Sequence, residues 1–265
     1  MNDTNKNEDD DPGKSFPRIR EVGFDAPWRW LKAGSRDLRR ARGSSLFYGM
    51  CFAIAGWMMQ LVFAHAYALF AGLATGFLLL GPCLSMGLYD ISRHLERGET
   101  PRLGASRIPW GSTLGNIGVF AAVLAVILLV WARASMVIFA LSYNGGVPSF
   151  ADVLRAVFGF EQPAFALIYF ASGGLFALLV FAISVVAMPL MLDRNTDAVT
   201  AAIASLIAFA RNPGPLLLWA ACIVALTALG FATFFVGLIF TTPLIGHASW
   251  HAYRDLVEPA QDITP

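Results

Sequence analysis

Long apolar runs separated by short polar stretches occupy most of this 265-residue chain. A helix needs about 20 apolar residues to cross the roughly 30 Å hydrocarbon core of a bilayer, because each residue adds about 1.5 Å. Runs of about this length cover residues 45–64, 66–88, 114–131, 163–190, 216–230 and 232–248. The pattern therefore predicts an all-α fold, a polytopic membrane helical bundle with six transmembrane helices.

The first two and the last two predicted spans resemble each other. In both pairs the second span contains a proline, Pro82 or Pro243, and an arginine, Arg93 or Arg254, follows it at the same spacing. An amphipathic stretch precedes each pair. We therefore predict pseudo-repeated hairpins, each preceded by a cytoplasmic amphipathic helix.

The residues outside the spans divide the chain further. Residues 1–25 begin acidic and polar without periodicity, which predicts a disordered N-terminal tail. Residues 26–43 predict a cytoplasmic amphipathic basic helix. The six-span membrane domain then covers residues 44–257, and residues 258–265 form a C-terminal tail.

One face of the predicted basic helix carries Trp28, Leu31, Ser35 and Leu38, and cations crowd the remaining faces. Aromatic residues at headgroup depth with arginines near phosphates are typical of interfacial helices. An ordinary positively charged flank of the first span explains the same cations without lipid specificity. Both interpretations place this helix at the cytoplasmic surface.

Composition and charge agree with this class of protein. Hydrophobic residues make up 57% of the chain and charged residues 14%, whereas soluble domains average about 45–50% and about 25%. Of the 19 Lys and Arg, ten precede Gly43, and Arg155 is the one that lies firmly on the opposite side. The positive-inside rule then predicts that both termini are cytoplasmic. The net charge of +1 argues against a nucleic-acid partner.

Four blocks of the sequence resemble the recurrent blocks of a known family. They are GPCLSMGLYDISRHLERGE at 81–99, MLDRNTDAVTA at 191–201, ARNPGPLLLWA at 210–220 and PLIGHASWHAYRDLV at 243–257. The family is bacterial, mainly proteobacterial, and consists of predicted six-span integral membrane proteins catalogued as a domain of unknown function. The resemblance implies a six-helix inner-membrane protein and supplies no catalytic residues.

Polar side chains gather where the predicted spans end on the cytoplasmic side. If the second and sixth spans pack by pseudo-symmetry, one cluster forms from Asp90, Arg93, His94, His247, His251 and Arg254. Salt bridges that close the bundle explain such a cluster, and binding of a headgroup or a partner is the alternative.

His247 and His251 lie one helical turn apart, a spacing that could suit metal or haem ligation. No Cys, Glu or further His recurs at a supporting spacing, and the three cysteines all lie inside apolar runs. We therefore predict no metal site and no cofactor.

Arg133 is a candidate charge on the periplasmic side, at the end of the third predicted span. Its side chain can reach the outer phosphates beside Trp131 by snorkelling. The alternative is an inward-facing arginine that grips an anionic solute or Glu161.

No phosphate loop, nucleophile elbow or zincin motif is present, so we predict that the protein is not an enzyme. The expected function is a non-enzymatic scaffold or accessory subunit, with the lipid bilayer and other membrane subunits as partners; the oligomeric state is left open. One alternative is a transporter or channel for a small or amphiphilic solute, which a hydrated cavity at Thr75, Ser172 and Thr227 would favour. Another is a lipid-interacting membrane-homeostasis protein.

Overall fold

The computed structural model describes residues 16–65, 84–99, 112–142 and 163–259, and within these ranges it is helical, with an isolated β-bridge between Ile19 and Val257. Residues 84–96 form one helical segment. The remaining helices are α1 (Ala26–Arg40), α2 (Arg42–His65), α4 (Ser112–Ser142), α6 (Pro163–Ser184), α7 (Ala187–Arg194), α8 (Ala198–Arg211), α9 (Pro213–Ala232) and α10 (Leu238–Leu256).

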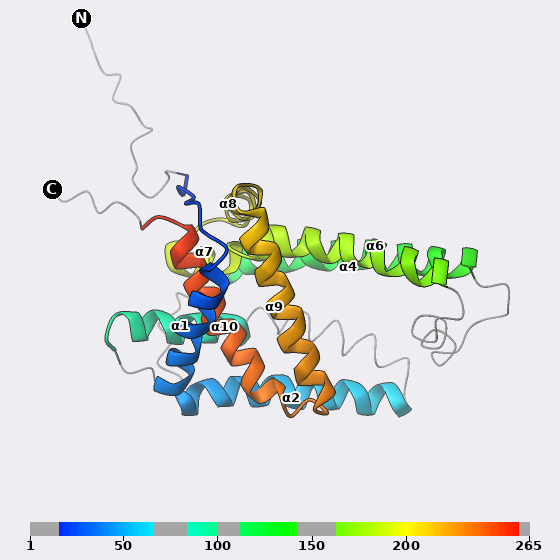
Figure 1. Ribbon diagram of the computed structural model, residues 1–265, viewed down its shortest axis with the longest axis horizontal. Coiled ribbons are helices and arrows are strands. Elements are labelled where there is room, and N and C mark those ends of the chain that lie inside the picture. Colours follow the sequence, from blue (N-terminus) through cyan, green and yellow to red (C-terminus); the bar gives the residue numbers. More distant parts are fainter. Residues whose placement is uncertain (1–15, 66–83, 100–111, 143–162, 260–265) are drawn as a thin grey trace, which may run out of the picture.

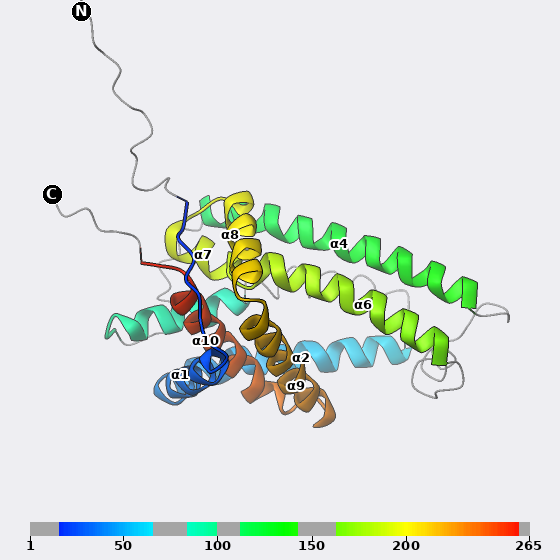
Figure 2. The same cartoon turned by 45° about the horizontal axis from the view of Figure 1, so that its top comes forward.

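The helices form two regions of different character (Figures 1 and 2). At one end α1, segment 84–96, α7, α8 and residues 247–256 of α10 gather into a compact part, which we call the head. From the head, α4 and α6 extend side by side in one direction, and we call this pair the arm. Helix α2 extends toward the same side, and α9 and α10 form a hairpin that packs on α2.

Three helical stretches of the described ranges are long and apolar enough to cross a membrane: Gly115–Ile138, Pro163–Arg194 and Pro213–Ala232. They correspond to the predicted third, fourth and fifth spans. Helices α2 and α10, which correspond to the predicted first and sixth spans, are not among them, and most of the predicted second span, including Pro82, lies outside the described residues. The prediction of an all-helical membrane fold is confirmed, whereas six spans and repeated hairpins stay predictions.

The predicted boundary between the fifth and sixth spans differs from the structure. The sequence places them on either side of residue 231, but α9 continues to Ala232 and α10 begins only at Leu238. Residues 233–237 form a turn in which Phe234 and Phe235 have positive φ angles of 52° and 67°.

The fourth predicted span is interrupted, and the cause is Pro189. A proline lacks the N–H that would bond the carbonyl four residues earlier and clashes with it; here that residue is Val185, at the break between α6 and α7. The buried Ser205 of α8 repairs the break: its hydroxyl accepts from the Val186 N–H (3.2 Å) and donates to the Ala182 carbonyl (2.7 Å). A side chain thus replaces one bond of the helix ladder.

Helix α1 packs on α10 through small residues. A Cβ on Gly34 would lie 2.7 Å from the Ala248 backbone nitrogen, so the two backbones lie very close. The buried face of α1 contains Trp30, Ala33, Gly34 and Asp37, whereas Trp28 is 61% exposed. The face buried in the protein is therefore not the predicted apolar face, which lies beside it.

Part of the predicted N-terminal tail packs on the head. Within the predicted 1–25 tail, residues 16–25 are placed, and the Arg20 N–H donates to the Leu256 carbonyl at 2.7 Å. The Asn212 side chain binds this strand-like segment on both sides, because it accepts from the Val22 N–H (2.8 Å) and donates to the Arg20 carbonyl (2.9 Å). The two ends of the described chain are therefore fastened to the head.

Candidate functional site

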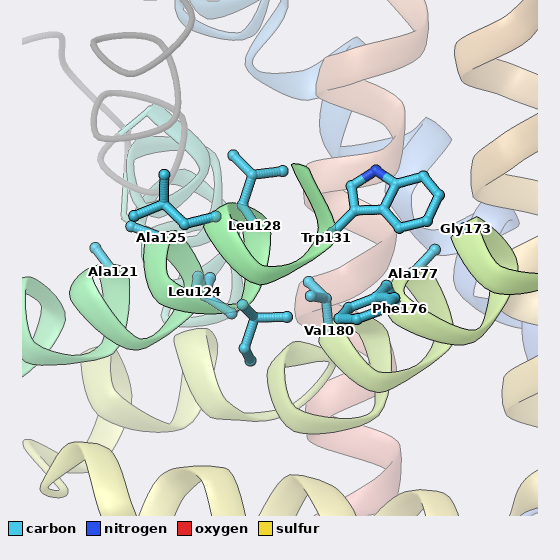
Figure 3. Close-up of a pocket in the computed structure, with 11 residues that line it drawn as sticks. Ala121, Leu124, Ala125, Leu128, Trp131, Gly173, Phe176, Ala177 and Val180 are labelled. Atoms are coloured by element: carbon cyan, nitrogen blue, oxygen red, sulfur yellow. The ribbon is translucent and has the colours of Figure 1, made fainter. Parts of the chain in front are cut away.

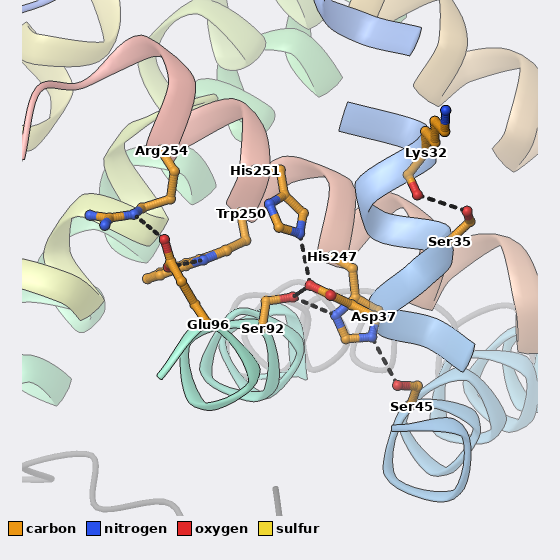
Figure 4. Close-up of polar contacts among 10 residues, drawn as sticks. All are labelled: Lys32, Ser35, Asp37, Ser45, Ser92, Glu96, His247, Trp250, His251 and Arg254. Carbon is orange, nitrogen blue, oxygen red and sulfur yellow. Dashed lines mark hydrogen bonds and ion pairs between the residues drawn. The ribbon is translucent and has the colours of Figure 1, made fainter. Parts of the chain in front are cut away.

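A chain of hydrogen bonds lies buried where four helical elements meet in the head (Figure 4). His247 of α10 is fully buried, and its two ring nitrogens each lie 2.8 Å from a hydroxyl, Nε2 from Ser45 of α2 and Nδ1 from Ser92 of segment 84–96. The Ser92 hydroxyl donates to the Asp37 carboxylate of α1 (2.9 Å), which also lies 2.7 Å from His251 Nε2. We call these five residues the polar joint, because they connect α1, α2, segment 84–96 and α10.

The electrostatics of the joint favour one ionised carboxylate beside one neutral imidazole. Burial opposes the charge of Asp37, but the hydrogen bond and charge of His251, together with the Ser92 hydrogen bond, lower the pKa of Asp37 below its usual value. Burial disfavours the imidazolium and lowers the pKa of His247 to about 4, against the opposing effect of Asp37. At neutral pH His247 is therefore uncharged and can donate from one nitrogen and accept at the other.

A second polar set connects segment 84–96 to the C-terminal turns of α10 and to α7. The Glu96 carboxylate accepts from Trp250 (3.2 Å) and pairs with Arg254 (3.1 Å). Arg254 also lies 3.6 Å from Asp193, which accepts the hydroxyl proton of Tyr253 at 2.7 Å. These contacts close the head around α10.

The predicted cluster is thus divided into separate groups. His247 and His251 belong to the polar joint, and Arg254 to the Glu96 set. Asp90, Arg93 and His94 pair within their own helix, and Arg93 also donates to the Leu192 carbonyl at 3.0 Å. Segment 84–96 and α10 do meet, and the predicted His247 and Arg254 take part on the α10 side. On the side of segment 84–96 their partners are Ser92 and Glu96 rather than the predicted Asp90, Arg93 and His94.

Sequence reasoning missed Asp37, Ser45 and Ser92, three central members of the joint. Asp37 stands among cations on a helix, where an acidic residue ordinarily faces solvent. Asp37 follows Gly34 by three residues and Ala33 by four, and residues at these spacings share one face of a helix. This spacing is the one sequence signal that places Asp37 on the small-residue face. Ser45 and Ser92 carry no signal, since a serine at a helix end is common and its partner is set by tertiary contact.

The two histidines are not arranged as a pair of metal ligands. Both nitrogens of His247 bond hydroxyls, and His251 Nε2 bonds a carboxylate, so each ring has its own protein partners. Ser45 is fully buried as well, and Ser92 is 1% exposed, so a substrate has no route to these hydroxyls. The joint can hold helices together and hold or pass a proton.

The outward side of α1 carries positive charge. Arg29 pairs with Asp25 (3.0 Å) and Asp255 (2.9 Å). Four further cations are exposed, and none of them forms an ion pair with any residue that the structure describes: Lys32, Arg36, Arg39 and Arg40. We call these four residues the cationic edge.

An apolar cleft of about 370 Å³ lies between the two arm helices (Figure 3). Small residues line it at a spacing of four on both sides, Ala121 and Ala125 on α4 and Gly173 and Ala177 on α6, with Trp131 at one end. Arg133, two residues beyond, is exposed and has no ion-pair partner in the described ranges. Glu161, its alternative partner, lies outside the described residues.

Comparison with known proteins indicates the class of protein to which this chain belongs. Residues 69–193 match the family model "Predicted integral membrane protein (DUF2189)". No curated protein and no solved structure matches the chain. With the apolar helices, the match identifies a multi-pass integral membrane protein, and it includes the arm but ends before α8, α9 and α10.

Proposed function

We propose that this protein is a non-enzymatic, lipid-interacting protein of the inner membrane, with both termini cytoplasmic, that binds anionic headgroups along α1. The observation that carries the proposal is the cationic edge beside exposed aromatic residues. Lys32, Arg36 and Arg39 are exposed on the side of α1 away from α10. Phe24 and Trp28, 69% and 61% exposed, stand one turn apart at its start.

The position of α1 supports a contact with headgroups. At one end the Phe24 ring covers Gly214, in the first turn of the candidate span α9. At the other end, a single residue separates α1 from the apolar helix α2. Because α1 connects the starts of two apolar helices, it lies at the depth where hydrocarbon gives way to headgroups. Aromatic residues and cations together are favoured at that depth.

The charge of the cationic edge determines how large an effect on lipid retention we expect. A basic residue near an anionic membrane surface contributes about 1 kcal/mol. Removing two such charges should therefore weaken retention of an anionic lipid by about 2 kcal/mol, or roughly 30-fold. Salt should screen the interaction, since exposed charges interact over only about 8 Å at physiological ionic strength.

The test is the double variant Arg36→Gln/Arg39→Gln in nanodiscs that contain neutral and anionic phospholipids. Native mass spectrometry of the released protein should show fewer retained anionic lipids than for the unmodified protein. The matched control is Arg18→Gln/Arg97→Gln, which removes two exposed charges away from α1. Equal retention by the two double variants would contradict the proposal.

A scaffold or accessory subunit is the second candidate, and the cleft between α4 and α6 favours it. Small residues four apart allow a further transmembrane helix to approach closely, and the lining is apolar throughout except for the ring nitrogen of Trp131. Gly173→Leu should then reduce co-purification of a membrane subunit, whereas Gly174→Leu, where a Cβ meets nothing within 4 Å, should not. For the transporter alternative the described residues offer less, since the Ser172 hydroxyl donates to carbonyls of its own helix.

A further inference from the structure

The turn between α9 and α10 lies beside the middle of α2. The indole of Trp57 donates to the Phe234 carbonyl at 2.7 Å, and Gly56 faces the Phe235 ring. The part of α2 between Ser45 and Trp57, on the head side of the turn, is 12 residues or about 18 Å long. The part between Trp57 and His65, beyond the turn, is 8 residues or about 12 Å long. In Figures 1 and 2, α2 continues well past the turn. If α2 crosses the bilayer, the turn therefore lies inside the hydrocarbon core, which is roughly 30 Å thick.

The hairpin is also too short to cross from the head. The first turns of α9 pack on the head, because Trp219 is fully buried and meets the Trp30 ring of α1 edge-on at 5.8 Å. Residues 247–256 of α10 are held there by the polar joint and the Glu96 set. The part of α10 left outside, Leu238–Gly246, has nine residues and spans about 14 Å, half of the hydrocarbon core.

The backbone N–H groups of the turn are all paired within the hairpin. Each N–H from Thr233 to Thr241 donates within the hairpin, eight of them to backbone carbonyls and that of Gly237 to the Thr233 hydroxyl at 2.9 Å. The Thr233 hydroxyl in turn donates to the Gly230 carbonyl. A loop in water has no need of such complete pairing, whereas an unpaired amide in hydrocarbon costs several kcal/mol.

The side chains of the turn suit the same surroundings. Four large apolar residues stand out from it, Phe231, Phe234, Val236 and Phe240, each between 46% and 76% exposed. The chain contains no charged residue between Arg211 and Arg254. Phe234 and Phe235 have the left-handed backbone that a tight aqueous turn ordinarily gives to Gly or Asn.

We propose that α9 and α10 form a re-entrant hairpin, which enters the bilayer from the head side, turns at residues 233–237 among the acyl chains, and returns. The partner of this Phe-rich surface is the hydrocarbon interior of the bilayer. The C-terminus stays on the side of the head, but the fifth and sixth predicted spans are not crossings. This inference does not depend on lipid binding by α1.

Cysteine accessibility tests the inference in the full-length protein. Cys51, Cys83 and Cys222 are replaced by serine, and single cysteines are introduced as Val236→Cys or Phe240→Cys. Arg97→Cys, on the head side, and Leu141→Cys, at the far end of α4, serve as controls. A membrane-impermeant maleimide applied to spheroplasts and to inverted vesicles should label each control from one side. It should label neither turn position until detergent is added.

Each other outcome overturns the inference. Labelling of both turn positions from the Leu141→Cys side means that the hairpin crosses, and labelling from the Arg97→Cys side means that the turn lies outside the bilayer. Nitroxides at the same two positions in nanodiscs give an independent answer where labelling is slow. Collisions with oxygen should exceed collisions with a water-soluble nickel complex, and the reverse ratio also overturns the inference.

Discussion

The head and the arm use serine hydroxyls in opposite ways. In the head, Ser45, Ser92 and Ser205 each bond a different element from their own. Outside the head, Ser135 and Ser172 donate to carbonyls of their own helix. A hydroxyl that returns to its own helix has no influence on its neighbours, so those helices are positioned by shape and by lipid. The head is positioned by specific bonds, and changes there should cost more.

The largest loss should come from Gly34→Val, because the added side chain meets the Ala248 backbone, which cannot move aside. We expect the free energy of unfolding to fall by about 3 kcal/mol, with α1 released from α10. Thermal unfolding in detergent and proteolysis within residues 26–40 measure the effect. Gly43→Ala is the control: a Cβ there meets nothing within 4 Å, and a small gain is expected.

Acid should weaken the head next. The folded pKa of His247, about 4, lies below its ordinary 6.5, so its contribution is complete above pH 6.5 and is lost as the pH falls toward 4. Between pH 7.5 and pH 5 we expect the free energy of unfolding to fall by about 2 kcal/mol. The lowered pKa of Asp37 adds a further loss below pH 3.8. Urea unfolding of His247→Gln, which cannot titrate, should show a flatter pH profile; an unchanged profile would refute the assignment.

The variants Ser205→Ala in the head and Ser172→Ala in the arm compare the two regions with the same substitution. Without the hydroxyl, the buried Val186 N–H and the buried Ala182 carbonyl each lose a hydrogen-bond partner. We expect the free energy of unfolding to fall by about 1.5 kcal/mol. Ser172→Ala removes a bond that the α6 backbone does not need, and less than about 0.5 kcal/mol should change. Equal losses in thermal unfolding would mean that the contrast between head and arm is mistaken.

The smallest effect is expected at Arg133. Its side chain is exposed, so either long cation can reach the phosphates there. Arg133→Lys should alter stability by less than about 0.5 kcal/mol, and Arg133→Leu should cost little. A large loss of folded protein in Arg133→Lys would instead indicate forked hydrogen bonds of an inward-facing guanidinium, which lysine cannot reproduce.

The sequence predicts helix positions well wherever the length and composition of an apolar run determine them. Apolar length located α2, α4, α6 and α9, and Asn212 with Pro213 marked the boundary between α8 and α9. Composition does not say which neighbour an apolar helix meets. For this reason the sequence predicts a complete span at residues 232–248 but not that half of α10 is enclosed by the head.

The candidate site was predicted only in part, for a related reason. His247 and Arg254 stood out because each breaks an apolar pattern. Asp37 does not stand out, because the sequence predicts a surface helix with Trp28 at headgroup depth and gives no sign that another face of α1 is buried. In the structure, close packing of Ala33 and Gly34 on α10 buries that face. A buried carboxylate is recognisable only once the partners that stabilise it are in place.

The pairing of Ile19 with Val257 has a consequence for biogenesis. The two residues are 257 − 19 = 238 positions apart, so the N-terminal segment and α1 emerge from the ribosome long before their partners on α10. The apolar helices can enter the membrane one after another, but the head closes only when synthesis is almost complete. A chain that ends before α10 can still insert its other apolar helices into the membrane, but it leaves Trp30 and Asp37 uncovered. A protease at the membrane surface can distinguish it from the finished protein by this exposure.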